Sequence, residues 1–310
     1  MRTAPFEARR RLLRAALAVG AAAGLRPAPA WTQSALTITR PIPSSGEALP
    51  VIGLGSWITF NVGGDPVART ECTAVMREFL AAGGTLIDSS PMYGSSQAVI
   101  GDGLRRLGAT RRVFAADKVW TSAAAKGRAQ AEASRALWGV PRFALLQVHN
   151  LLAWQDHLPM LQALKAAGQV RYVGITTSEG RRHEEFVEIM RSHRLDFVQV
   201  SYNLHDREVE ERILPLAHDR GIAVIANRPF QGGALLKRVG RHPLPAWAAD
   251  IDCSNWAQFA LKFIVSHPAV TCAIPATSRV AHLRENMGAA YGRLPDPALR
   301  RQMVAALERL

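Results

Sequence analysis

From residue 35 onward, short apolar segments alternate along the chain with longer segments whose apolar residues recur at helical spacing. Short apolar runs bounded by turn residues predict strands, and the longer periodic segments predict helices. The eight predicted strands are Val51–Leu54, Thr85–Asp88, Val113–Lys118, Ala144–His149, Val170–Thr176, Asp196–Tyr202, Ala223–Asn227 and Thr271–Pro275. The predicted helices include Arg69–Ala82, Gln97–Leu107, Trp154–Ala167, Glu184–Arg191, Glu208–Arg220 and a final helix, Ala298–Arg309.

Strands that alternate with helices predict parallel βαβ units, and eight such units in about 250 residues favour a (β/α)8 TIM barrel. The main competitor is an open doubly wound sheet with a Gly-x-Gly-x-x-Gly turn after its first strand. Gly53–Ile58 lacks the third glycine of that turn. Thr37–Arg40 and Leu49–Val51 flank a turn-like cluster and predict an N-terminal β-hairpin. We therefore expect one α/β barrel domain over residues 31–310, with an N-terminal hairpin and a C-terminal helix.

Residues 1–30 have a different pattern. Three arginines, Arg9 to Arg11, precede Leu12, a weakly apolar stretch from Ala15 to Leu25, and a small-residue cleavage site at Ala28-Pro29-Ala30. This segment resembles a twin-arginine (Tat) signal peptide, which implies export of the folded protein to the periplasm. Its apolar stretch is too short for a permanent membrane span. The alternative is an ordinary amphipathic N-terminal helix.

The composition excludes several other classes of protein. A hydrophobic content of 48% excludes an intrinsically disordered chain. The net charge of +13 suggests nucleic-acid binding, but 33 of the 38 basic residues are Arg and they are scattered, so we expect no nucleic-acid partner. Cys72, Cys253 and Cys272 form no CxxC pair, so neither a metal site nor a disulfide framework is expected.

Four polar residues lie at or just after the ends of successive predicted strands. Asp88 ends the second strand and Tyr93 follows it, Lys118 ends the third, and His149 ends the fourth. In a barrel, the carboxyl ends of the strands surround the active site, so these side chains should converge. Taken singly, each has a structural alternative, such as a helix cap for Asp88 or a core position for His149.

Together the four residues suit proton donation to a carbonyl group. Free Tyr has a pKa near 10, and a neighbouring cation lowers it by stabilising the phenolate. Lys118 can supply that cation, and Asp88 can hold Lys118 charged and in place. His149 can bind the substrate oxygen and orient it toward Tyr93, so that the developing alkoxide meets positioned donors.

The segment Gly83–Gly94, which contains Asp88 and Tyr93, resembles the signature of the aldo-keto reductase family. Residues 47–57, 145–150 and 266–278 resemble the opening hairpin and first strand, the histidine strand and the last segment of that family. The resemblance runs from about residue 36 to 290. It implies an NADPH-dependent reductase of aldehydes and ketones on a (β/α)8 barrel, with Asp88, Tyr93, Lys118 and His149 as its catalytic tetrad.

The resemblance also implies which residues hold the coenzyme. They are Thr176, Gln199, Phe230, Gly232, Leu235, Thr277, Arg279, Glu285 and Asn286. Thr176 and Gln199 match residues that hold the nicotinamide carboxamide. The loop with Phe230, Gly232 and Leu235 resembles one that covers the pyrophosphate. Glu285 and Asn286 match the pair that contacts adenine. No metal is implied.

Several positions depart from the family pattern. Asn227 replaces a Tyr that stacks on the nicotinamide in many members, and Ala276 and His282 replace basic residues around the 2′-phosphate. A lost charged contact to a phosphate is costly. We therefore expect NADPH as coenzyme with NADH as an alternative, and we expect Arg228 and Arg279 as replacement phosphate ligands.

The substrate expectation rests on three tryptophans. Trp57, Trp120 and Trp154 each follow a predicted strand, so we expect them to line the substrate pocket and to favour apolar or aromatic carbonyl compounds. Packing beneath the loops is the alternative for all three.

Two other functions compete with carbonyl reduction. Lys118 could attack a carbonyl in a Schiff-base lyase. A barrel that only senses the coenzyme is the second alternative, although it would need neither Tyr93 nor Lys118. For an exported reductase, one bound coenzyme supports one turnover unless a redox partner, which the sequence does not identify, reduces it again.

Overall fold

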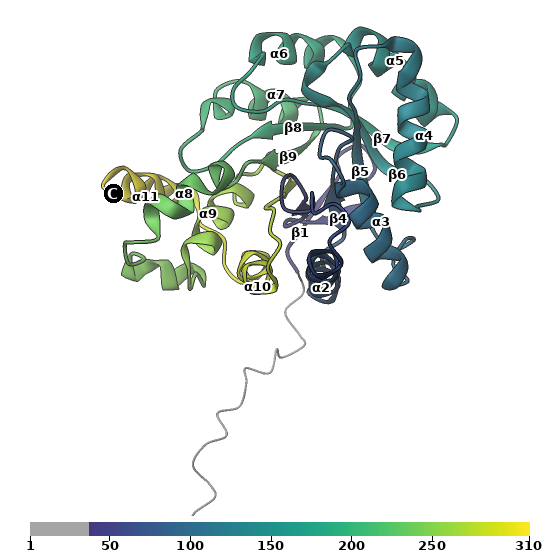
Figure 1. Ribbon diagram of the computed structural model, residues 1–310. Helices are drawn as coiled ribbons and strands as arrows, with labels where there is room; N and C mark the ends of the chain where they lie inside the picture. The colour runs from purple at the N-terminus through teal and green to yellow at the C-terminus, as the bar shows by residue number, and fades with distance from the viewer. Residues whose placement is uncertain (1–36) are drawn as a thin grey trace, which may run out of the picture. The chain divides into compact units, whose positions relative to one another are not determined.

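The computed structural model describes residues 37–310, in which eight parallel strands form one sheet whose spatial order follows the chain from β3 to β10 (Figure 1). Parallel bridges from Ile52 to Ala273 and from Gly55 to Ala276 join the first strand to the last. The sheet therefore closes into the expected (β/α)8 barrel. The N-terminal segment expected to be a signal peptide lies outside the described residues.

All eight predicted strands and the predicted hairpin are present, with bounds that are shortened or shifted at several ends. The hairpin is formed by β1 (Thr39–Pro41) and β2 (Ala48–Pro50). The barrel strands are β3 (Leu54–Gly55), β4 (Leu86–Asp88), β5 (Phe114–Val119), β6 (Phe143–Val148), β7 (Val170–Thr176), β8 (Phe197–Ser201), β9 (Ala223–Asn227) and β10 (Cys272–Ala273).

Helices follow the strands around the outside of the barrel (Figure 1). They are α2 (Pro66–Ala81), α3 (Ser96–Arg106), α4 (Gly127–Trp138), α5 (Trp154–Ala166), α6 (His183–Ser192), α7 (Ile213–Asp219), α8 (Ala234–Val239), α9 (Trp256–Val265), α10 (Val280–Gly288) and α11 (Pro297–Glu308). The single helix predicted over 208–220 is wrong: a short 3-10 turn at Glu208–Glu210 precedes α7. Pro215 explains the break, because proline is tolerated in the first turn of a helix but not in its interior.

Side chains on each strand alternate between two buried layers. On β5, Phe114 and Ala116 face the barrel interior, whereas Ala115 and Val119 pack against the helices. Ile42 and Leu49, at the hairpin, join the inner layer and close the amino-terminal end of the barrel. Because of this two-residue period, Lys118 belongs to the inner face at the opposite end, where the strands finish.

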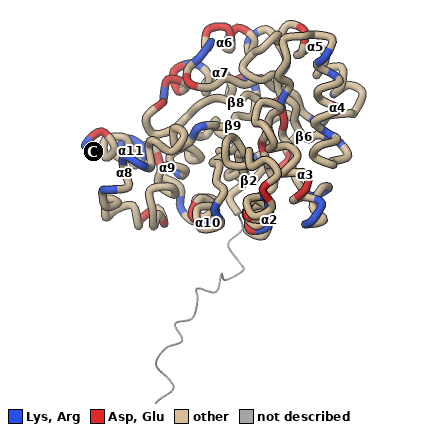
Figure 2. Tube along the Cα trace, in the orientation of Figure 1, with Lys and Arg blue, Asp and Glu red and all other residues tan. Residues whose placement is uncertain are grey.

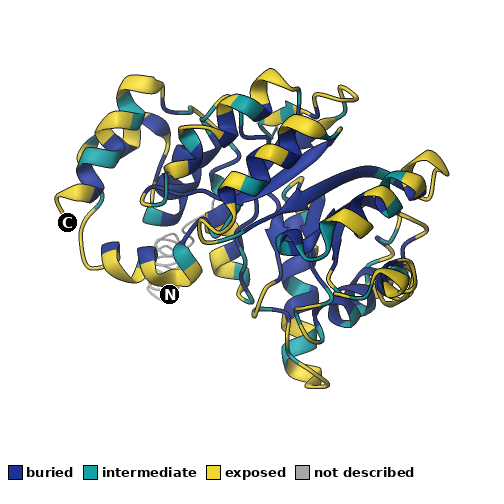
Figure 3. Cartoon of the chain, turned by 90° about the horizontal axis from the view of Figure 1, so that it is seen from above, coloured by how far each residue is buried: buried dark blue, intermediate teal, exposed yellow. Residues whose placement is uncertain are grey.

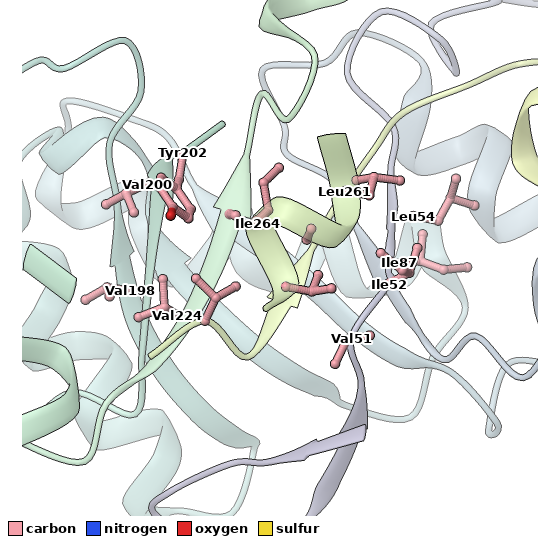
Figure 4. Close-up of a cluster of buried hydrophobic side chains, with 14 of the residues drawn as sticks. Val51, Ile52, Leu54, Ile87, Val198, Val200, Tyr202, Val224, Leu261 and Ile264 are labelled. Atoms are coloured by element: carbon pink, nitrogen blue, oxygen red, sulfur yellow. The ribbon is translucent and has the colours of Figure 1, made fainter. Parts of the chain in front are cut away.

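The outer layer joins the sheet to its helices. Val200 of β8 and Val224 of β9 lie in one cluster with Ile264 of α9 (Figure 4). The strands are buried at the centre, and the exposed faces belong to the helices and loops (Figure 3). Charged residues of both signs lie mainly on this outer surface (Figure 2). None of the helices in residues 37–310 combines the length and the apolar character needed to cross a membrane.

Candidate active site

The carboxyl ends of the strands surround a cavity of about 510 Å³. Asp88, Tyr93 and His149 line this cavity, and they come from β4, the loop after β4 and the end of β6. Lys118 is fully buried and lies next to them at the end of β5. The four residues that the sequence places at strand ends therefore meet in one site.

Lys118 and Asp88 form a buried ion pair. The Lys118 ammonium donates to Asp88 Oδ2 at 2.6 Å and to the carbonyl oxygen of Ser89 at 2.8 Å. The other oxygen of Asp88 accepts from Gln199 Nε2 at 2.9 Å. Burial alone would lower the pKa of Lys118, but the Asp88 carboxylate and Tyr93 raise it above its usual value. Lys118 therefore stays an ammonium ion at neutral pH.

Tyr93 lies close to both this cation and a histidine ring. The Lys118 nitrogen is 5.1 Å from the centroid of the Tyr93 ring. Burial raises the pKa of Tyr93, and the positive charge of Lys118 opposes that rise. The His149 ring meets the Tyr93 ring edge-on, with centroids 5.7 Å apart.

His149 is a neutral base at physiological pH. Burial, assisted by the positive charges of Lys118 and Arg181, lowers its pKa to about 2. A neutral imidazole carries one N–H donor and one acceptor nitrogen. His149 can therefore donate a hydrogen bond to a substrate oxygen without giving up a proton.

Asp117, next to Lys118, faces the helices instead of the cavity. Its carboxylate accepts from Gln97 Nε2 and Trp138 Nε1, both at 2.7 Å, and from the Lys118 backbone N–H at 2.8 Å. Burial raises its pKa to about 7, although these hydrogen bonds oppose the rise. These hydrogen bonds of Asp117 hold β5 in place behind Lys118. No sequence pattern identified this role of Asp117.

Most of the residues assigned to the coenzyme lie on the cavity wall. Those lining it are Thr176, Gln199, Phe230, Gly232, Thr277, Glu285 and Asn286. Leu235 is buried behind the wall, where its neighbour Leu236 takes the lining position, and Arg279 is exposed at the start of α10.

The cavity wall fits a dinucleotide. Asn286 is buried, and its Oδ1 has no hydrogen-bond partner among the described residues. A buried acceptor without a partner is costly, so this oxygen suits a donor such as the adenine amino group. Gln199 is held through its nitrogen by Asp88, which leaves its oxygen available to accept a hydrogen bond from a ligand. Asn286 lies on α10 and Gln199 on β8, and both line the same cavity.

Only one of the three expected tryptophans lines the cavity. Trp57 does so and is 40% exposed. Trp120 is not among the residues that line it, and its backbone N–H and carbonyl are hydrogen-bonded to the side chain of Gln130 on α4. Trp154 begins α5, where its indole N–H donates to Glu185 on α6 at 2.7 Å. A partly buried indole N–H usually finds such a partner, and here the partner lies on the outer helices.

A group of ion-paired residues at the cavity mouth was identified only in part from the sequence, which singled out Arg228 and Trp57 but not Glu179 or Arg181. Glu179 binds Arg228 at 3.0 Å and Arg181 at 2.9 Å, and the Arg228 guanidinium lies 5.9 Å from the Trp57 ring. These residues come from the loops after β7, β9 and β3, and all of them line the cavity. In the sequence, the one feature that could have identified these residues is that each follows the end of a predicted strand.

The sequence of the chain matches a known family over most of its length. The model of the aldo/keto reductase family matches residues 51–301. The chain belongs to the aldo/keto reductase family. It is an NAD(P)H-dependent oxidoreductase that reduces carbonyl compounds.

Individual relatives agree with this assignment. A methylglyoxal reductase of Escherichia coli is 28% identical over 250 residues, covering 78% of this chain and 86% of the relative. An NADH-specific methylglyoxal reductase of the same organism is 24% identical and covers 87% and 99% of the two chains. Among solved structures, an aldo-keto reductase from Klebsiella pneumoniae in complex with NADPH has a TM-score of 0.73 at 23% identity, covering 88% of this chain and 95% of that chain. That likeness supports the fold.

Proposed function

We propose that Tyr93 is the proton donor in carbonyl reduction and that Lys118, Asp88 and His149 prepare it for that role. The observation that carries this proposal is the Lys118 ammonium, fully buried, 2.6 Å from Asp88 and 5.1 Å from the centre of the Tyr93 ring. A fixed cation stabilises the phenolate that remains after proton transfer. It therefore lowers the cost of using a phenol as an acid at neutral pH.

The other residues orient the reactants. When bound, NADPH or NADH supplies a hydride to the carbonyl carbon. Thr176 and Gln199 would hold the nicotinamide carboxamide, and Asn286 would bind adenine. His149, being neutral, donates a hydrogen bond to the carbonyl oxygen and directs it toward Tyr93. Tyr93 and His149 are therefore both in position before negative charge develops on the carbonyl oxygen. Donors held in place in advance stabilise the resulting alkoxide most effectively.

The Schiff-base alternative fits the structure poorly. An attacking lysine must be neutral and must reach the substrate. The Lys118 ammonium is fully buried, is bonded to Asp88 and Ser89, and has a raised pKa. Lys118 therefore acts on Tyr93 and does not attack the substrate.

For the substrate, we favour small 2-oxoaldehydes together with apolar aldehydes. The first class is suggested by the two methylglyoxal reductases among the relatives. The second is suggested by the cavity wall, where Trp57, Ile58, Met92 and Phe230 offer apolar surface. NADPH and NADH are both proposed as coenzymes, because Ala276 and His282 leave Arg228 and Arg279 as the candidate cations for the 2′-phosphate, and Arg228 is already paired with Glu179.

Replacing Tyr93 with Phe tests the proposal. Loss of a general acid should lower kcat for methylglyoxal by about 10²–10⁴-fold. Fluorescence titration should give the same coenzyme Kd, since the phenol acts in the transition state. Tyr291→Phe is the matched control, because the Tyr291 hydroxyl binds the carbonyl of Ala82, away from the cavity. Near-normal turnover of Tyr93→Phe would remove Tyr93 from the mechanism.

We also propose export through the twin-arginine route, with the coenzyme already bound. The support is the sequence of residues 1–30, with Arg9, Arg10 and the small-x-small site before Trp31. Replacing Arg9 and Arg10 with Lys in the full chain should leave the protein in the cytoplasm. An unchanged periplasmic fraction, or none in either form, would contradict this route.

A further inference from the structure

Ser90 places a hydroxyl group against the proposed substrate-orienting histidine. Its Oγ lies 2.8 Å from His149 Nδ1, although the two residues are 59 positions apart. Ser90 is fully buried, so no solvent competes for this hydrogen bond. The other ring nitrogen, Nε2, has no hydrogen-bond partner within residues 37–310, and His149 lines the cavity.

The local turn fixes the Ser90 hydroxyl. Ser90 to Tyr93 form a turn in which the Tyr93 N–H donates to the Ser90 carbonyl at 2.9 Å. Pro91 follows Ser90, and proline favours that position of a turn. The Met92 N–H donates to Ser90 Oγ at 3.2 Å, as serine side chains commonly allow two residues on. One lone pair of the hydroxyl is therefore already used.

The proton count then selects one form of His149. A serine hydroxyl has one proton to donate and two lone pairs. If Ser90 donates to Nδ1, every group is satisfied, and the imidazole proton lies on Nε2, facing the cavity. If Nδ1 instead donates to Ser90, the buried hydroxyl proton has no acceptor in the described part of the chain. A buried donor left without a partner is costly.

We propose that Ser90 is a positioning residue that fixes the Nε2–H tautomer of His149 and so aims its single N–H at the substrate oxygen. This inference rests on the proposed role of His149 in carbonyl reduction. Ser90 itself is not among the residues that line the cavity. It acts through the imidazole, and its contribution is to remove the alternative form in which Nε2 would repel the substrate oxygen.

The test measures the tautomer directly. Nitrogen NMR of the uniformly labelled full chain, saturated with NADPH, distinguishes protonated from bare ring nitrogens, and His149→Gln identifies the His149 signals. We expect Nε2–H in the wild type and a mixture of both tautomers in Ser90→Ala. Ser90→Thr keeps the hydroxyl and should restore the Nε2–H form. Ser89→Ala removes the neighbouring hydroxyl, which binds Ser96 instead, and should leave the tautomer as it is.

Kinetics supply the second readout. The loss of one buried hydrogen bond should lower kcat of Ser90→Ala by about 2- to 13-fold with an unchanged coenzyme Kd. An Nδ1–H form in the wild type, or an unchanged tautomer in Ser90→Ala, would overturn the inference. The NMR result does not depend on turnover, so it stays informative even if Tyr93→Phe shows that the proposed mechanism is wrong.

Discussion

Replacing Asp88 with Asn should expose the dependence of the site on one buried ion pair. Asn keeps the shape of the side chain and can still accept from Gln199, but it offers an amide where Lys118 Nζ needs a carboxylate at 2.6 Å. The ammonium would retain only the Ser89 carbonyl at 2.8 Å. Breaking a fully buried pair in this way costs about 3–5 kcal/mol. At about 2–4 °C per kcal/mol, Tm should fall by about 6–20 °C.

The loss of stability in Asp88→Asn should depend on pH, and the direction of this dependence follows from the pKa of Lys118. In the wild type, the pKa of Lys118 is raised, so its stabilising contribution is present at neutral pH and is lost as pH rises through that pKa. In Asp88→Asn, burial without a partner should depress the pKa of Lys118. The unfolded chain then binds the proton more tightly, and the stability of the variant rises with pH. The difference in unfolding free energy between the wild type and Asp88→Asn should therefore shrink as the pH rises from about 8 to 10.5.

Urea denaturation across this pH range would measure that difference. Glu188→Gln is the matched control, since it removes the same charge from an exposed pair with Arg191 and should cost less than about 1 kcal/mol. An equal, pH-independent loss in both variants would refute the reasoning.

Three further predictions concern the coenzyme, the scaffold and the histidine. Arg279→Ala should weaken NADPH binding by about tenfold and leave NADH binding unchanged, as measured by fluorescence titration. Gly101→Ala should destabilise the protein by about 1–3 kcal/mol in urea denaturation, because the new Cβ would lie 1.9 Å from the Leu137 carbonyl oxygen. His149 should contribute no transition near pH 6.5 to the kcat–pH profile, because its pKa is held at about 2.

The barrel could be predicted from the sequence because each strand is a short apolar run followed by a periodic segment. The strand bounds differ most at β3 and β10, where the first and last strands close the barrel through isolated bridges. The helix expected over 208–220 failed at Pro215, a residue whose effect depends on where the helix begins. Hydrophobic period alone does not locate that beginning.

The convergence of Asp88, Tyr93, Lys118 and His149 could be predicted for a topological reason, since parallel strands bring their carboxyl ends together. The same reasoning placed Trp120 and Trp154 at the mouth, where they do not lie. A strand fixes the direction of its own side chains by its two-residue period, but residues beyond its end follow the loop or the next helix. Trp154 accordingly points to Glu185 on α6.

The contact between Ser90 and His149 could not be predicted in this way. Ser89 and Ser90 are adjacent and chemically identical, yet only Ser90 reaches the histidine, while Ser89 binds Ser96. Their difference arises from the turn at Pro91 and the packing of β4 against its neighbours. Sequence spacing brings residues to the same end of the barrel but does not decide which hydroxyl meets which ring.

The positive charge of Lys118 affects the protonation of both Tyr93 and His149. The Lys118 ammonium opposes the rise in the pKa of Tyr93 and, with burial, lowers the pKa of His149. It therefore favours proton release from the phenol and prevents protonation of the imidazole. A single buried cation thus has different effects on two donors, one that gives up its proton and one that keeps it. Because Asp88 holds that cation, a change at Asp88 should alter both donors together, whereas a change at Ser90 should alter only His149.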